Sequence, residues 1–332
     1  MRQAAREGVT RRTFVAGALG ALALSASGCG IRLEDDAPRV PLVPTRTPVP
    51  AEAELVALTA DTLALAELAA TVPGPLAAAL TTIHRRQHTV LRTTLLRQQV
   101  PVALLDAPPT STGTTVGAST SAPASTSPSA IPSPSPSPSP SPTVSALDLA
   151  DAEGRAAAKA GEFAGAEADL LATLASLHAQ RYAAATLLSG RPPTVPTDPV
   201  AGAAVEALAA STSAAVYLFE VVSARSDGAQ RTRSDATLDV LRRLRADQVA
   251  GGSAPEDSIG HPLPFAVTTS ADAARLAREV VFSLRAGYGE HLGALAASED
   301  GGGLEAATRW LGTVEVQAQR WGVSLVPFPG LE

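Results

Sequence analysis

The chain has 332 residues, enough for more than one folded unit, and 45% of them are hydrophobic while only 3% are aromatic. Its core must therefore be built from leucine, valine and alanine, and this favours helices because alanine has the highest helix propensity. The formal net charge of −6 excludes a general affinity for nucleic acid, and the single cysteine excludes an internal disulfide.

The first 28 residues have the pattern of an export signal peptide. Several arginines precede an apolar run from Phe14 to Gly28, which is too short to span the ~30 Å of hydrocarbon in a membrane. Arg11 and Arg12, followed by Thr13 and Phe14, resemble a twin-arginine signal, and this resemblance implies export of an already folded protein. An ordinary secretory signal that contains two adjacent arginines is the alternative.

Cys29 follows the apolar run directly, in a context that resembles the lipobox of bacterial lipoproteins. The resemblance implies that Cys29 carries lipid and anchors the protein to the outer face of the cell membrane. Loss of residues 1–28 removes four arginines and one glutamate, so the formal charge goes from −6 to −6 − 3 = −9. Anionic lipid repels this charge, so attachment would depend on the acyl chains. The alternatives are a free buried thiol and a cysteine that is lost with a cleaved signal.

The segment after Cys29 predicts a tether and then a helical unit. Residues 29–50 contain repeated prolines and predict an extended tether. Residues 51–100 predict a helical hairpin with a turn at Val72-Pro73-Gly74. Residues 101–145 are rich in proline, serine and threonine and predict a disordered insertion. Residues 146–190 predict one long helix, which three glycines bend or bring close to a neighbour.

The hairpin and the long helix are expected to pack together. Two helices alone bury too little surface to be stable. Loop entropy permits the contact, because doubling a loop costs only about 0.6 kcal/mol. The insertion would then interrupt one helical unit, although a true domain boundary at this point is the alternative.

Residues 199–325 contain four amphipathic segments. Their apolar side chains recur every three or four residues over about 201–223, 234–250, 271–297 and 304–321. Thr269 or Ser270 is placed to cap the third helix. Helices joined by short connections predict an antiparallel four-helix bundle.

Four short segments in this region, taken in order, resemble an uncharacterised ferritin-like domain of actinobacterial envelope lipoproteins. They are Ala214-Ala215-Val216-Tyr217, Leu263-Pro264-Phe265-Ala266-Val267, Ala286-Gly287-Tyr288 and Gln319-Arg320-Trp321. The resemblance covers roughly the last 125 residues and implies no reaction. The predicted fold is all-α, with a ferritin-like antiparallel four-helix bundle at the C-terminus plus an N-terminal helical unit interrupted by a disordered Pro/Ser/Thr-rich insertion.

The chain departs from that family where a metal ligand is expected. Relatives carry a Glu-His pair at the positions that Thr212 and Ser213 occupy here. A di-iron bundle also uses two Glu-x-x-His motifs, and this sequence contains none. The neighbours of Thr212 on its stripe are apolar, so its hydroxyl is expected to bond back to the carbonyl of Leu208.

Three histidines form a candidate metal site in the N-terminal unit. His84 and His88 are four residues apart, so they project from one side of a helix. With His178 and a carboxylate or water, they would suit Zn²⁺ or Cu²⁺. Arg85 and Arg86 lie between the first two and disfavour a cation. The competing interpretation is that these histidines edge the core and bond to polar neighbours.

The sequence therefore predicts an exported cell-envelope lipoprotein with a binding, scaffolding or envelope-maintenance role, without catalytic residues and without a cofactor. Its expected partners are the membrane, through the N-terminal lipid, and an envelope protein or small ligand of unknown identity. The alternative is a ferritin-like metal-binding protein or oxidoreductase that holds a divalent metal.

Overall fold

The computed structural model describes residues 46–107, 144–196, 198–252, 260–298 and 302–332. The chain divides after Arg46, and residues 47–332 form one compact unit. Within the described ranges every regular element is a helix, which confirms the all-α prediction. The predicted signal peptide, most of the tether and most of the Pro/Ser/Thr-rich insertion lie outside these ranges.

The N-terminal part of the compact unit contains two helical hairpins. The predicted hairpin is present, with a short helix after it, and a second pair of helices follows the insertion. The elements are α1 (Glu52–Thr71), α2 (Pro75–Arg97), α3 (Val102–Leu105), α4 (Ala146–Ala158), the 3₁₀ helix η1 (Ala160–Phe163) and α5 (Ala168–Ser189).

The prediction of one long helix over residues 146–190 is wrong. The chain leaves α4 at Lys159, passes through η1 and re-enters a helix at Ala168, so α4 and α5 pack against each other. Gly161 and Gly165 lie in this break, where their low helix propensity reduces the cost of interrupting the helix. Folding back lets both α4 and α5 bury an apolar face, which a single straight helix could not do for both halves.

The C-terminal part forms the four expected helices. They are α6 (Ala203–Arg225), α7 (Gly228–Val249), α8 (Ser270–Ala296) and α9 (Gly303–Arg320). Thr269 begins α8 with a capping box, because its hydroxyl accepts from the Asp272 backbone N–H while the Asp272 carboxylate accepts from the Thr269 N–H. Ser145 and Asp148 start α4 in the same way.

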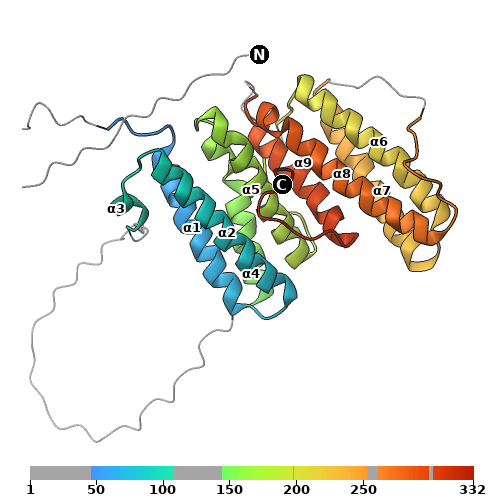
Figure 1. The fold of residues 1–332 in the computed structure, drawn as a ribbon, viewed down its shortest axis with the longest axis horizontal. Coiled ribbons are helices and arrows are strands. Elements are labelled where there is room, and N and C mark those ends of the chain that lie inside the picture. Colours follow the sequence, from blue (N-terminus) through green and yellow to red (C-terminus); the bar gives the residue numbers. More distant parts are fainter. Residues whose placement is uncertain (1–45, 108–143, 197, 253–259, 299–301) are drawn as a thin grey trace, which may run out of the picture. The chain divides into compact units, whose positions relative to one another are not determined.

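These helices form two groups that share α5 as a neighbour. The first helix group is α1, α2, α4 and α5, and the second helix group is α6, α7, α8 and α9. Figure 1 shows α5 between the α1–α2 hairpin and α9, and α5 contacts both α8 and α9. The two groups are therefore parts of one compact unit and meet along α5.

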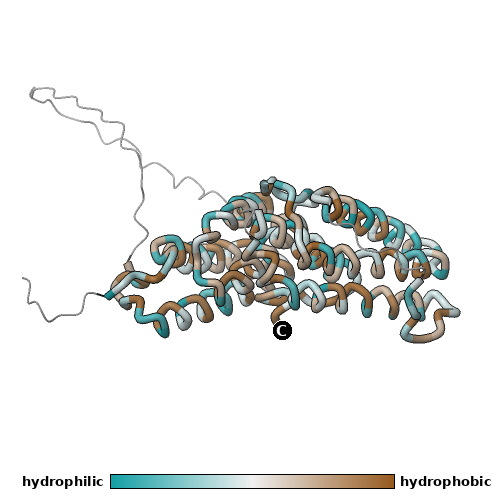
Figure 2. The backbone as a smooth tube through the Cα atoms, turned by 90° about the horizontal axis from the view of Figure 1, so that it is seen from above, coloured by the Kyte–Doolittle hydropathy of each residue, from teal (hydrophilic) through white to brown (hydrophobic). Residues whose placement is uncertain are grey.

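One apolar core runs through both groups. Its main cluster joins residues such as Leu55 on α1, Leu177 on α5 and Leu311 on α9, each with 1% or less of its surface exposed. Figure 2 shows hydrophilic and hydrophobic residues mixed along the helices, as expected for helices that are each buried on one side. Burial of this continuous cluster couples the stability of the two groups.

The contact between the groups requires a glycine on α9. A Cβ atom added to Gly312 would lie 2.6 Å from Cδ1 of Tyr182 and 2.9 Å from the carbonyl oxygen of Ala179, both on α5. Such distances are shorter than van der Waals contact, so a side chain here would push α9 away from α5. Gly312 thus permits the close approach that joins the two helix groups.

The C-terminal tail ties both groups together beyond α9. Pro327 and Pro329 offer backbone carbonyls to Gln87 on α2 and to Ser176 on α5. Gly330 then passes so close to α8 that a Cβ on Gly289 would meet its backbone. Residues 321–332 therefore form a strap across α2, α5 and α8.

Among the described helices, α6 is long and apolar enough to cross a membrane by length and composition. Its stripe of Val205, Leu208 and Phe219 is fully buried and packs into the core with α7 and α8. This buried stripe of α6 is thus used for packing, while 33% of the most apolar window of the helix is buried in all.

Candidate functional site

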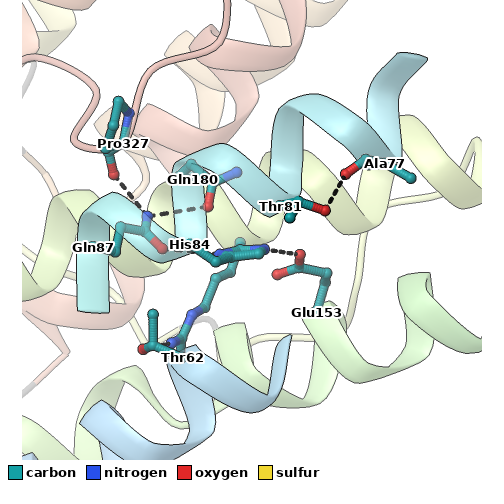
Figure 3. A network of polar contacts seen from close by, with 9 residues as sticks. Thr62, Ala77, Thr81, His84, Gln87, Glu153, Gln180 and Pro327 are labelled. Atoms are coloured by element: carbon teal, nitrogen blue, oxygen red, sulfur yellow. Dashed lines mark hydrogen bonds and ion pairs between the residues drawn. The ribbon is translucent and has the colours of Figure 1, made fainter. Parts of the chain in front are cut away.

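The first helix group contains a buried polar network around His84. Nδ1 of His84 lies 3.0 Å from Oε1 of Gln87, and Nε2 lies 2.5 Å from Oε1 of Glu153 on α4. The Gln87 amide donates to Oε1 of Gln180 at 3.2 Å and to the carbonyl of Pro327 at 2.7 Å. Figure 3 shows these side chains converging from α2, α4, α5 and the strap. All four side chains are fully buried.

Arg181 places a cation inside the same network. Its side chain is 1% exposed, and Nη2 donates to the hydroxyl of Thr62 at 2.5 Å. Thr62 in turn donates to the carbonyl of Leu58. Burial lowers the pKa of Arg181 to about 10, although the charges of Glu153 and Asp61 act in the opposite direction. The guanidinium therefore stays charged at neutral pH, near the carboxylate of Glu153. We call His84, Gln87, Glu153, Gln180, Arg181 and Thr62 the charged centre.

The predicted metal site of His84, His88 and His178 is not formed. Both ring nitrogens of His84 face oxygen atoms of other side chains, which leaves no lone pair directed at a metal. His88 is partly exposed, and burial followed by the charge of Arg92 lowers its pKa. Within the residues that the structure describes, no three His, Cys, Asp or Glu side chains are grouped to hold a metal ion.

His178 is instead a neutral core residue. Its Nδ1 lies 3.0 Å from the carbonyl oxygen of Ala156, and its ring packs on Phe163 at a centroid distance of 5.3 Å. Burial and then the charge of Arg181 lower the pKa of His178 to about 3. The imidazole is therefore uncharged across the physiological range, in agreement with the competing interpretation that these histidines edge the core.

The second helix group has a neutral polar network at its centre. The hydroxyl of Thr212 donates to the carbonyl of Leu208 at 2.9 Å, as predicted, and lies 2.8 Å from the hydroxyl of Tyr288. The Gln248 amide donates to the Tyr288 hydroxyl at 2.5 Å. Burial raises the pKa of Tyr288. Tyr288 is 1% exposed, so its hydroxyl lies in the interior of the second helix group. We call Thr212, Gln248 and Tyr288 the neutral centre.

A buried ion pair lies elsewhere in the second group. Nη1 of Arg285 on α8 is 3.2 Å from Oε2 of Glu315 on α9, and both side chains are almost fully buried. The same guanidinium bonds the Ser324 carbonyl and the Glu332 carboxylate, so the strap completes its shell. Burial raises the pKa of Glu315 to about 7, while Arg285 opposes this shift.

These donor sets do not fit the di-iron cofactor of ferritin-like bundles. Such a cofactor needs several carboxylates and two histidines from four helices. The neutral centre offers two hydroxyls and an amide, and Glu315 faces Arg285. The charged centre has one carboxylate, Glu153, and holds the cation of Arg181. A divalent metal placed in either centre would lack anionic ligands or face a fixed positive charge.

A pocket of about 460 Å³ opens between α5, α7 and α9. Its wall includes the aromatic rings of Tyr182 and Trp310 and the side chains of Leu244 and Val316. Burial raises the pKa of Tyr182, which a hydrogen bond to Thr313 opposes. We call this hollow the α5–α7–α9 pocket.

Charged side chains surround the mouth of this pocket. Asp247 accepts from Nη1 of Arg309 and from the indole N–H of Trp310, both at 2.6 Å, so its charge is compensated. Arg243 and Arg320 also line the pocket and are exposed. In the described part of the chain neither of these two has an ion-pair partner. The mouth therefore carries an excess of positive charge in a protein whose formal charge is −6.

The remaining predicted site residues lie outside the described ranges. They are Arg11, Arg12 and Phe14 of the predicted export signal and Cys29 of the predicted lipid anchor. Sequence reasoning missed Glu153, Gln180 and Arg181. The available signal was the position of Gln180 and Arg181 in the middle of the alanine-rich segment 168–189, where few other side chains are polar.

A comparison with known families matches the C-terminal part of the chain. Residues 203–332 match the model of a domain of unknown function (DUF4439), which begins at the first residue of α6 and includes the strap. A comparison with curated proteins gave no match, and a comparison with solved structures gave none either. The second helix group and the strap thus correspond to an uncharacterised C-terminal domain, as the sequence predicted in part.

Proposed function

We propose that this chain is an exported lipoprotein, anchored by lipid on Cys29 at the outer face of the cell membrane, which acts by binding a partner or ligand and not by catalysis. The observation that supports the non-catalytic role is that polar side chains of the protein itself fill the centres of both helix groups. Where a ferritin-like enzyme would hold metal, this chain holds neutral side chains that bond to one another and, in the first group, the cation of Arg181. The ferritin-like ancestry of the second helix group is part of the proposal.

The buried groups support this role because of the energy needed to displace them. Removing a partner from a buried ion pair leaves an uncompensated charge, at a cost of about 3–5 kcal/mol. Metal binding in the charged centre would require Glu153 to leave its bond with His84 while Arg181 remained nearby. A second candidate, the metal-binding oxidoreductase, lacks such support in the donor sets described above.

Metal analysis of the purified full chain tests the non-catalytic part. We expect iron, manganese, zinc and copper to be well below one atom per chain after expression in medium that contains all four. A matched pair of variants gives the control: Glu315→Gln and Glu153→Gln should leave the metal content unchanged. Stoichiometric metal that disappears in either variant would overturn the proposal.

Cell fractionation tests the anchor. We expect Cys29→Ala to move the protein from the membrane fraction to the soluble exported fraction, with Ser27→Ala as a control that remains in the membrane. Retention of Cys29→Ala in the membrane would refute the lipid anchor. Replacing Arg11 and Arg12 by lysine should block export, and continued export of that variant would favour the general secretory route.

A further inference from the structure

The α5–α7–α9 pocket has the size and lining of a small-molecule site. Pockets that hold such ligands measure about 300–1,000 Å³ and have mostly apolar walls with a few polar groups. The volume of about 460 Å³ lies in that range. Tyr182 and Trp310 supply the aromatic surface, and both are well buried, which gives the wall a fixed shape.

The charges at the mouth indicate the sign of the ligand. The one carboxylate in the lining, Asp247, is already bonded to Arg309 and Trp310. Arg309 also donates to the carbonyl of Pro196, so its position is fixed by two elements. This leaves Arg243 on α7 and Arg320 on α9 as the guanidinium groups without an ion-pair partner in the described residues. Guanidinium groups bind carboxylates and phosphates through paired hydrogen bonds.

We propose that the α5–α7–α9 pocket binds an anionic amphiphile, a molecule in which a carboxylate or a phosphate ester is joined to an apolar chain. The anionic head contacts Arg243 and Arg320, and the apolar chain lies against Trp310 and Tyr182. The proposal rests on the non-catalytic binding role and names its ligand class. A dissolved fatty acid or alkyl phosphate and the head of a membrane phospholipid share this chemistry.

Titration calorimetry with the full chain carrying Cys29→Ala tests the ligand class without detergent. The probes are decanoate and decyl phosphate below their micelle concentrations, with decanol, inorganic phosphate and decyltrimethylammonium as comparisons. We expect saturable binding of the two anionic amphiphiles, at least about tenfold tighter than any of the three comparison compounds. Equal binding of decanol or of the cation would overturn the role of the arginines, and equal binding of inorganic phosphate would overturn the role of the apolar wall.

Two kinds of variant test the location. The double variant Arg243→Gln/Arg320→Gln should weaken decyl phosphate binding at least about tenfold, because the charged hydrogen bonds from both guanidinium groups to the phosphate are lost. Both side chains are exposed, so the fold should tolerate the substitutions. The control Arg225→Gln/Arg278→Gln has the same change in charge at exposed positions outside the pocket and should bind as the parent does. Val240→Phe adds apolar bulk to the pocket wall while both arginines are kept, and it should also weaken binding. Unchanged binding in both the double variant and Val240→Phe would refute the site.

Vesicle sedimentation distinguishes the two sources of the ligand. Vesicles of phosphatidylglycerol and of phosphatidylcholine are compared with the same Cys29→Ala protein. Sedimentation with phosphatidylglycerol that the double arginine variant loses identifies a membrane lipid as the ligand, whereas binding of decyl phosphate alone identifies a dissolved amphiphile.

The outcomes also separate this proposal from the proposed function. If none of the probes binds while the metal content stays low and Cys29→Ala leaves the membrane, the ligand class is wrong and the non-catalytic lipoprotein role stands. Stoichiometric metal in the purified chain would contradict that role whatever the amphiphile titration gives.

Discussion

The two helix groups differ in what they bury at their centres. The charged centre of the first group holds Arg181, Glu153 and His84, whereas the neutral centre of the second holds Thr212, Gln248 and Tyr288. Both centres connect several helices by hydrogen bonds between side chains that are far apart in sequence. Buried charge is costly when a partner is lost, while a neutral hydrogen bond contributes about 0.5–1.5 kcal/mol. Similar architecture therefore gives the two groups different sensitivity to substitution and to pH.

The strongest way to break this comparison is to remove the buried cation. We expect Arg181→Met to lower the free energy of unfolding by about 3–5 kcal/mol, because the buried carboxylate of Glu153 loses its nearby positive charge. Gln248→Met is the matched change in the neutral centre and should cost about 1–3 kcal/mol. Urea denaturation of the full chain measures both values. Equal losses would mean that the charge of the first centre makes no difference to stability.

The junction between the groups is tested by adding a single methyl group to α9. Gly312→Ala should lower the free energy of unfolding by about 1–3 kcal/mol, since the new Cβ would overlap Tyr182 and Ala179 on α5. Gly287→Ala on α8 is the control, because nothing lies within 4 Å of its added Cβ. That substitution should raise stability by about 0.5–1 kcal/mol through helix propensity. A neutral effect of Gly312→Ala, measured by thermal denaturation, would show that the two groups do not depend on this contact.

The two groups are expected to respond to acid in opposite directions. The pKa of Glu315 is raised to about 7 from 4.5, so its contribution to stability is present below pH 4.5 and is lost as the pH rises through 7. The pKa of His178 is lowered to about 3 from 6.5, so its contribution is present above pH 6.5 and is lost as the pH falls toward 3. Each of these two side chains changes the free energy of unfolding by up to about 1.4 kcal/mol per pH unit.

Denaturation at pH 7 and at pH 5 measures these contributions. Glu315→Gln should make the chain lose more stability on acidification, because a group that is favourable at low pH is removed. His178→Gln should make it lose less. If both variants changed the difference in free energy of unfolding between pH 7 and pH 5 in the same direction, the assignment of opposite signs would be wrong.

The smallest expected effect comes from the same threonine-to-valine substitution made once in each helix group. Thr62 and Thr212 both donate to the carbonyl four residues earlier, and both contact a second polar group. For Thr62 that group is the guanidinium of Arg181, and for Thr212 it is the hydroxyl of Tyr288. We expect Thr62→Val to cost about 1 kcal/mol more than Thr212→Val, because hydrogen bonds to charged groups are stronger. Chemical denaturation of the two variants side by side decides this, and a larger loss for Thr212→Val would reverse our view of the two centres.

Local sequence information determined most of the helices in this chain. Apolar periodicity located α1, α2 and the four helices of the second group, because the residues on the buried face of a helix recur every three or four positions in the sequence. Capping chemistry at Thr269 and the backbone bond of Thr212 were also predictable, since each involves residues only three or four positions apart. The composition alone excluded an internal disulfide, because the chain has one cysteine.

Only the tertiary structure decided which polar residues meet. Glu153 contacts His84 across 69 positions of sequence, and Arg181 contacts Thr62 across 119. Neither pair has a local pattern, because the energy that favours each contact exists only once the helices have packed. The same is true of the fold back between α4 and α5, which depends on the faces that α1 and α9 offer, and of the α5–α7–α9 pocket, whose walls come from three separate helices.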